Sequence, residues 1–155
     1  MKVKIEIETQ LAEAEVIIRC PQLDDTIVNL QNHIVQQANG DRCLTLHRGD
    51  TEYYVKVADI YFFETEGKVI HAHTADNIFE TQLKLYELEE QLPAAFMRIS
   101  KSTIANLDYV YSITRNLTAS SVIEFVGSNK KALVSRSYYK SVTERIKIRR
   151  LGGKV

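Results

Sequence analysis

The chain has 155 residues, 45% of them hydrophobic, which is enough for one domain with a buried core. No apolar run approaches the ~20 residues of a membrane-spanning helix, and the alternating N-terminus is unlike a signal peptide, so we expect a cytoplasmic protein without membrane insertion. The net charge of zero hides a division: residues 1–95 carry 8 Lys and Arg against 17 Asp and Glu, and residues 96–155 carry 12 against 3. This division hints at contact with nucleic acid or a membrane surface, although two solvated faces would give the same count.

Residues 1–42 are predicted to form a strand–strand–helix extension. Charged and apolar residues alternate over residues 2–8, which is typical of a half-buried strand, and residues 15–20 form a second candidate strand. Asp24 or Asp25 can cap a helix that runs to about residue 37, because Ile27, Leu30 and Ile34 recur at intervals of three and four. This acidic extension would face away from a nucleic acid and could carry dimerisation or contact a regulatory partner.

From residue 43 to 146 the pattern is mainly β, so the expected class is mainly β, or α+β overall. Apolar alternation and turn residues predict strands over 43–47, 53–57, 60–64, 68–74, 78–81, 97–99, 110–114, 122–126 and 132–134. A short helix over 83–92 ends at Pro93, and a last helix begins near Ser135 or Ser137. Residues 147–155 are expected to be a basic, flexible tail.

Several short segments, in this order and spacing, resemble the LytTR DNA-binding domain found at the C-terminus of many bacterial response regulators. They are V-A-D-I-Y-F-F-E (57–64), E-G-K (66–68), L-K-L-Y-E-L-E-E-Q-L (83–92), F-M-R-I-S-K-S (96–102), I-A-N-L (104–107) and V-S-R-S-Y (134–138). The resemblance covers residues 57–146 and implies short strands in small antiparallel sheets, with DNA contacted by loops in successive major grooves. It also implies paired direct repeats as the DNA site. We expect no receiver domain like that of the longer regulators, since residues 1–40 are too few to form one.

Carried over by position, the resemblance places DNA contacts in the 66–68 turn, the 100–102 turn and the approach to the last helix. The candidate DNA-binding residues are Lys68, Arg98, Ser100, Lys101, Ser102, Asn106, Ser135, Arg136 and Ser137. Arg136 is the first choice for a base contact, because a guanidinium can donate two hydrogen bonds to guanine. The family's His-Arg-Ser triplet is Ser100-Lys101-Ser102 here, which keeps phosphate contact but puts base preference in question, because Lys lacks the planar fork of Arg.

Ordinary structural roles fit the same side chains. They are a surface ion pair for Arg136, solvated turns for Lys68 and Lys101, helix capping for Ser135 and Ser137, backbone hydrogen bonds for Asn106, and a solvent-facing position for Arg98. The late-loop cations Arg115, Lys130 and Lys131 fit nonspecific attraction to phosphates.

No catalytic or metal-binding pattern emerges from the remaining residues. His71 and His73 share a strand face, but no further ligand completes a metal site. A nucleophile pair of Cys43 with His47 or His71 lacks a glycine-rich oxyanion loop, and the six glycines form no phosphate-binding fingerprint. We expect no enzyme, cofactor or metal, and we interpret Cys20 and Cys43 as buried free thiols, with a disulfide as the alternative.

The sequence therefore supports a sequence-specific, double-stranded DNA-binding transcription regulator of LytTR type that reads the major groove through loops. It would be a homodimer at least on DNA, and a separate protein could supply the regulatory input. The alternative is a protein–protein adaptor that retains the fold without binding DNA.

Overall fold

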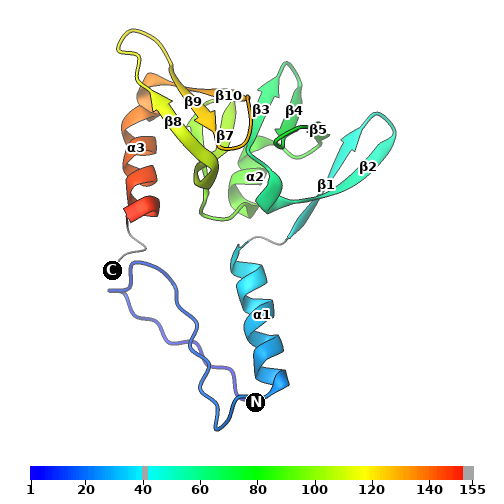
Figure 1. Cartoon of the computed structure of the whole chain (residues 1–155), viewed down its shortest axis with the longest axis vertical. Helices are drawn as coiled ribbons and strands as arrows, with labels where there is room; N and C mark the ends of the chain where they lie inside the picture. Colours follow the sequence, from blue (N-terminus) through cyan, green and yellow to red (C-terminus); the bar gives the residue numbers. More distant parts are fainter. Residues whose placement is uncertain (40–41, 152–155) are drawn as a thin grey trace. The chain divides into compact units, whose positions relative to one another are not determined.

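The computed structural model describes residues 1–39 and 42–151, and the chain divides into two units, Met1–Val35 and Gln36–Val155. The second unit holds both β-sheets and all 13 Tyr and Phe residues of the chain. We call the second unit the β-rich unit and the first the N-terminal unit (Figure 1). None of the helices in the described ranges has the length and apolar character that crossing a membrane requires.

The larger sheet of the β-rich unit has seven antiparallel strands in the order β2-β1-β5-β4-β3-β7-β6. Their bounds are β1 Cys43–Arg48, β2 Thr51–Lys56, β3 Phe62–Glu66, β4 Val69–His73, β5 Ile78–Thr81, β6 Phe96–Ser100 and β7 Thr103–Asn106. The β1–β2 hairpin joins β5 through the single pair His47–Glu80, whereas β3 pairs over its length with β4. The β3–β4 and β6–β7 hairpins therefore form the well-connected part of this sheet.

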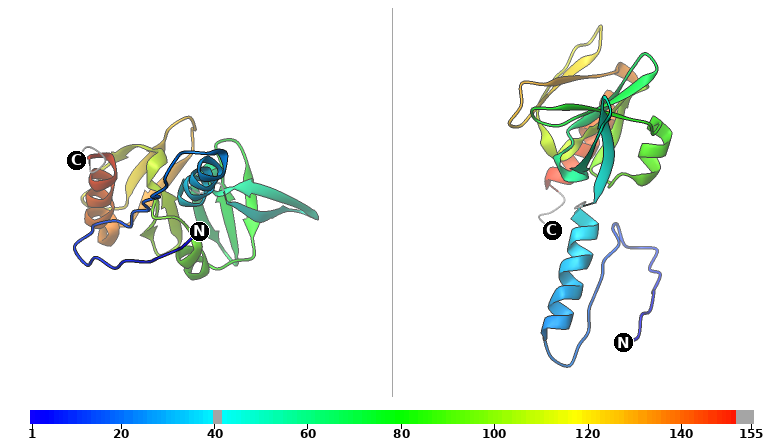
Figure 2. Two further views of the ribbon diagram at one scale, coloured as in Figure 1. Left: turned by 90° about the horizontal axis from the view of Figure 1, so that it is seen from below. Right: turned by 90° about the vertical axis from the view of Figure 1, so that its right-hand side faces the viewer.

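The smaller sheet has three antiparallel strands in the order β10-β9-β8, with bounds β8 Val110–Thr114, β9 Ser121–Phe125 and β10 Lys131–Val134. Two helices belong to this unit, α2 at Leu85–Gln91 and α3 at Arg136–Leu151. Helix α3 follows β10 directly and packs beside β6 and the smaller sheet (Figures 1 and 2). Short 3-10 turns occupy Val57–Asp59 and Leu107–Tyr109.

Two hydrophobic cores lie on opposite faces of β3 and β7. Phe62 and Ala105 face the core shared with the smaller sheet and α3, whereas their neighbours Phe63 and Ile104 face the core shared with α2 and β1. Successive residues of a strand point to opposite faces, so a strand between two cores has no polar side. All four residues of β7 are accordingly buried.

The predicted mainly β class is confirmed, and every predicted strand from residue 43 onward is present with small shifts at its ends. Strand β7 was missing from the prediction, because a strand buried on both faces shows no alternation. The helices predicted over 83–92 and after Ser135 are confirmed as α2 and α3.

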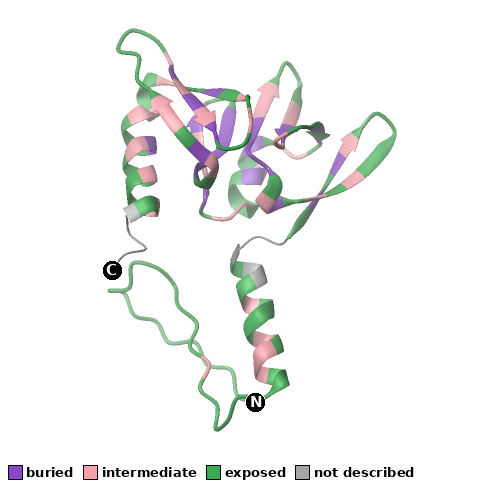
Figure 3. Cartoon of the chain, viewed as in Figure 1, coloured by how far each residue is buried: buried purple, intermediate pink, exposed green. Residues whose placement is uncertain are grey.

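The two strands predicted over 2–8 and 15–20 are not formed in this structure, although the predicted helix is present as α1, Asp25–Asn39. The Asp24 carboxylate accepts a hydrogen bond from the Ile27 backbone N–H at 3.0 Å, as predicted for a cap. A strand requires backbone partners, and the alternation over residues 2–8 specifies a face without supplying them. The segment is exposed throughout (Figure 3).

Two further predictions are corrected. Residues 147–151 of the predicted tail continue α3, and residues 152–155 lie outside the described residues. The helix continues because Arg149 donates to both carboxylate oxygens of Asp108, at 2.8 and 2.9 Å, and Arg150 donates to the Val110 carbonyl oxygen at 2.6 Å. Cys20 and Cys43 are free thiols, but both are exposed rather than buried.

Candidate nucleic-acid interface

The three loops proposed from the sequence are brought together at one end of the β-rich unit. The Thr65 backbone N–H donates to the Ser102 carbonyl oxygen at 2.8 Å, which joins the end of β3 to the β6–β7 turn. The Ser135 N–H donates to the Ile99 carbonyl oxygen at 3.0 Å, which joins the start of α3 to the end of β6. The turns at 66–68 and 100–102 and the segment 135–137 are therefore held next to one another, and together we call them the loop cluster.

The 100–102 turn is held in shape by its own serines and by Arg98. The Ser102 N–H donates to the Ser100 hydroxyl at 3.2 Å, and the Arg98 guanidinium donates to the Lys101 carbonyl oxygen at 2.5 Å and to the Glu89 carboxylate. The Lys101 side chain is exposed. Arg98 therefore positions the turn from beneath, and Lys101 is the cation that the turn presents to solvent.

The start of α3 presents Arg136 to solvent. Ser135 precedes the helix, and its carbonyl oxygen accepts hydrogen bonds from the N–H groups of Tyr138 and Tyr139, at 3.0 and 3.1 Å. Its hydroxyl lies 3.3 Å from the hydroxyl of Ser137, which is the second residue of the helix. The exposed Arg136 is the first residue of α3, so its side chain extends from the helix N-terminus, where the backbone N–H groups favour an anion.

The 66–68 turn combines one cation with an acidic group. Gly67 adopts φ +61°, the left-handed conformation that favours glycine, and Lys68 after it is exposed. The Glu66 carboxylate lies 3.1 Å from the His71 Nδ1 atom. Burial raises the pKa of the nearby Glu64 carboxyl, and the negative charge of Glu66 raises it further. This turn is therefore the least cationic of the three loops.

Asn106 is corrected from a candidate DNA contact to a structural residue. It is 4% exposed, at the end of β7 farthest from the 100–102 turn. Its amide nitrogen donates to the Ile60 carbonyl oxygen at 3.2 Å, and its amide oxygen accepts from the Asp108 N–H at 3.1 Å. Both ends of the amide are occupied within the fold, as the structural alternative predicted.

Two cations beside the loop cluster extend its positive surface. The Arg115 guanidinium lies 5.1 Å from the centre of the Tyr139 ring, in the first turns of α3. Lys140, exposed on α3, was not selected from the sequence. Its spacing of four residues from Arg136 places both on one face of the helix, and this spacing is the signal that could have found it.

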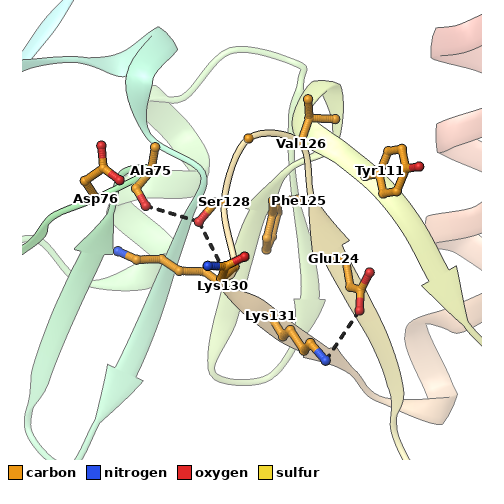
Figure 4. A pocket seen from close by; sticks show the side chains of 11 residues that line it. Ala75, Asp76, Tyr111, Glu124, Phe125, Val126, Ser128, Lys130 and Lys131 are labelled. Atoms are coloured by element: carbon orange, nitrogen blue, oxygen red, sulfur yellow. Dashed lines mark hydrogen bonds and ion pairs between the residues drawn. The ribbon is translucent and has the colours of Figure 1, made fainter.

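Lys130 and Lys131 lie at the opposite end of β10 from Ser135, beside an open hollow of about 980 Å³ (Figure 4). The Lys130 ammonium donates to the Asn77 carbonyl oxygen at 2.7 Å, and Lys131 lies 3.4 Å from the Glu124 carboxylate. The Lys130 contact ties the β9–β10 loop to the loop before β5, whereas the Lys131 contact joins paired residues of β10 and β9. Both lysines are thus remote from the loop cluster and have partners within the fold.

One histidine of the β-rich unit, His73, is buried. The His73 ring stacks on Phe62, with ring centres 4.1 Å apart, and neither ring nitrogen has a hydrogen-bond partner among the described residues. Burial, together with the smaller effects of the charges of Lys130 and His71, lowers the pKa of His73 from 6.5 to about 4. The imidazole is neutral near pH 7 and belongs to the core.

Comparisons with known proteins identify the family and the fold of the β-rich unit. Residues 50–147 match the family model of the LytTr DNA-binding domain. Two curated relatives, uncharacterized HTH-type transcriptional regulators of Staphylococcus aureus strains NCTC 8325 / PS 47 and COL, are 30% identical over 96% of this chain and 99% of their own length. The LytTr domain of a protein described as a methyl-accepting/DNA response regulator from Bacillus cereus superposes with a TM-score of 0.63 at 20% identity, over 69% of this chain and 98% of that domain.

Proposed function

Because the chain belongs to the LytTr DNA-binding domain family, we propose that it is a transcription regulator that binds double-stranded DNA in a sequence-specific manner through its loop cluster. It would act in the bacterial cytoplasm, as a homodimer at least on DNA, and would take its regulatory input from a separate partner. The observation that carries the proposal is the convergence of three loops, distant in sequence, whose exposed tips each present a cation: Lys68, Lys101 and Arg136.

The three cations suit different contacts with DNA. Arg136 stands at a helix end and makes no ion pair with the described residues, and its guanidinium can donate two hydrogen bonds to O6 and N7 of one guanine in the major groove. Lys101 is a compact charge on a turn, suited to a phosphate oxygen. The serine hydroxyls and the free N–H groups at the start of α3 suit a second phosphate.

DNA contact through loops, rather than through a recognition helix, also fits the arrangement of the helices. In the described part of the chain, five strands separate α1 from α2 and five separate α2 from α3, so no two helices are consecutive as in a helix-turn-helix motif. DNA contact by loops is therefore the mode that this fold offers.

The test is fluorescence anisotropy of the full chain with a duplex from upstream of its own gene and with a scrambled duplex, over a salt series. We expect Arg136→Ala to lose about 1–3 kcal/mol of binding free energy, mostly on the preferred duplex. Lys101→Ala should weaken both duplexes alike and reduce the salt slope by about one unit.

Matched controls are Arg145→Ala, on the same helix two and a half turns farther along, and Lys56→Ala, an exposed lysine at the end of β2. Both should bind as the wild type does. The proposal would be contradicted if the wild type bound neither duplex at low salt, which would favour the adaptor alternative. Loss of preference in Arg145→Ala instead of Arg136→Ala would place the reading surface elsewhere.

A further inference from the structure

The N-terminal unit exposes a row of apolar side chains that nothing in the described structure covers. Val3, Ile5 and Ile7 are 89%, 86% and 87% exposed, and they alternate with charged residues over residues 2–8. Val16 and Leu23 are also exposed. So many solvated aliphatic side chains in one short unit mark a surface that is buried in an assembly.

We propose that residues 2–8 form this assembly with a second copy of the chain, pairing antiparallel across a two-fold axis at Ile5. The segment lacks strand partners in its own unit, so its backbone N–H and C=O groups are available for a ladder. The interface lies outside the loop cluster, and the proposal is therefore independent of the DNA contacts.

The charge pattern identifies a second copy as the partner. The sequence K-V-K-I-E-I-E has two cations before Ile5 and two anions after it, at mirror-image distances. Antiparallel pairing about Ile5 sets Lys2 opposite Glu8 and Lys4 opposite Glu6 of the other copy, and sets Val3 opposite Ile7. A two-fold interface must be self-complementary, and this segment is self-complementary in both charge and apolar side chains.

The structure shows the charged side chains on a common face. The Lys4 ammonium lies 2.6 Å from the Glu6 carboxylate, two residues along an extended segment. Lys2 and Glu8 line the same shallow surface, together with Glu15 and Arg19 and the apolar Leu11 and Ile17. The four charged side chains of residues 2–8 thus share one side, and the alternation of an extended segment leaves Val3, Ile5 and Ile7 on the other.

Two copies together supply what one copy lacks. Residues 2–8 and 15–20 are not paired in the single copy, and we infer that assembly orders them into one sheet of four strands, with residues 15–20 of each copy at its edges. A sheet of this size can hold an apolar face that a two-stranded ribbon cannot. The half-buried stripe of α1, formed by Ile27, Leu30 and Ile34, is available to cover that face. Parallel pairing of the two segments, aligned residue for residue, would instead set Lys2 opposite Lys2 and Lys4 opposite Lys4 of the second copy.

Charge reversal tests the register. The full chain, 17.7 kDa as a monomer, should sediment as a dimer at micromolar concentration. Lys2→Glu with Lys4→Glu makes all four charged positions acidic, and Glu6→Lys with Glu8→Lys makes them all basic. Each double variant alone should raise the dimer dissociation constant about tenfold or more, because four like-charged pairs then oppose one another. An equimolar mixture of the two should restore the dimer.

The fourfold variant with all four charges exchanged is the matched control, because it restores opposite charges across the axis and should dimerise as the wild type does. A separate cross-linking test uses Ile5→Cys in a background with Cys20→Ser and Cys43→Ser. Facing residues in an antiparallel pair are about 4.5–5.5 Å apart at Cα, within disulfide range, so this chain should link to itself under mild oxidation. Val3→Cys, which faces residue 7, should not.

A wild type that sediments as a monomer would overturn the proposal, whether or not a different protein occupies the surface. So would charge-reversed variants that remain dimeric, or a mixture that stays monomeric. Binding of each variant to a single duplex site, together with its tyrosine fluorescence, shows that the β-rich unit is folded and separates failure of this interface from failure of DNA binding.

Discussion

The two units of this chain place similar apolar residues in opposite environments. In the β-rich unit Phe63 and Ile104 are buried between sheet and helix, whereas Ile5 and Ile7 of the N-terminal unit stand in solvent. Both sets occur in segments with strong strand character. The difference shows that alternation of apolar and polar residues decides which side chains share a face. The segment becomes a strand only when another element packs on that face and a neighbouring strand pairs with its backbone.

The stability of the β-rich unit can be measured separately because all the tyrosines lie after residue 52. Tyrosine fluorescence and near-ultraviolet circular dichroism therefore report the β-rich unit alone. Each prediction below pairs a residue of the β-rich unit with a residue of the same type in the N-terminal segment or α1.

The largest expected effect is that of a core isoleucine. Ile104→Ala should lower the free energy of unfolding by about 3 kcal/mol, because the side chain is 1% exposed and its loss leaves a cavity in the core shared with α2 and β1. Ile7→Ala should change the unfolding of the β-rich unit by less than about 0.5 kcal/mol, since Ile7 belongs to the N-terminal unit and is 87% exposed there. Urea denaturation followed by tyrosine fluorescence measures both, and equal effects would contradict the division into units.

The next effect is a pH dependence centred on His73. In the unfolded state the His73 imidazole has a pKa of 6.5, whereas in the folded state its pKa is about 4. Between pH 4 and 6.5 the unfolded state therefore binds more protons than the folded state. Stability should therefore fall as the pH drops from 6.5 to 4, by about 3 kcal/mol from this residue.

His73→Phe, which preserves the stacking on Phe62, should flatten the difference in stability between pH 6.5 and 4. His33→Asn, in the exposed α1, is the matched control and should leave the wild-type slope unchanged. An unchanged slope in His73→Phe would assign the acid sensitivity to other groups.

A smaller effect separates structural asparagine from solvated asparagine. Asn106→Ala should cost about 1–3 kcal/mol of stability, because it leaves the Ile60 carbonyl oxygen and the Asp108 N–H without their partner. Folded Asn106→Ala should still prefer the same duplex. The exposed Asn32→Ala should change the unfolding of the β-rich unit by less than about 0.5 kcal/mol. Lost preference in a stable Asn106→Ala would return this residue to the DNA contacts.

The smallest effect compares two ion pairs. Arg98 and Glu89 are 23% and 44% exposed and support the 100–102 turn, whereas Lys4 and Glu6 are 77% and 67% exposed. Glu89→Gln should cost within about 1 kcal/mol of stability and should weaken DNA binding, because the turn loses its anchor. Glu6→Gln should change neither quantity in the β-rich unit. Tighter DNA binding by Glu89→Gln would show that Arg98 contacts DNA and that the Glu89 carboxylate restrains it in the wild type.

Much of the β-rich unit could be predicted from local pattern because its hairpins have clear turn residues. Gly49 and Gly67 both adopt positive φ in the turns between paired strands, where glycine is the residue that the turn favours. Strand β7 could not be predicted in this way, since its burial on both faces depends on sheets formed by residues far along the chain. The end of α3 was likewise decided by Asp108, about 40 residues away.

For the candidate site, position along the chain indicated the three loops but not which side chains face outward. Arg98 and Lys101 both looked like free cations, and only the fold shows that one supports the other's backbone. Arg136 kept its exposed position at a helix start, which follows from local sequence. Roles that depend on a distant partner, such as that of Asn106 with Ile60, needed the structure.

The hydrogen bonds that join Thr65 to Ser102 and Ser135 to Ile99 have a kinetic consequence. They order the loop cluster before DNA arrives, so docking requires no slow rearrangement of the protein. The rate of association should then rise in proportion to DNA concentration without reaching a plateau, and the lifetime of the complex should distinguish one operator from another.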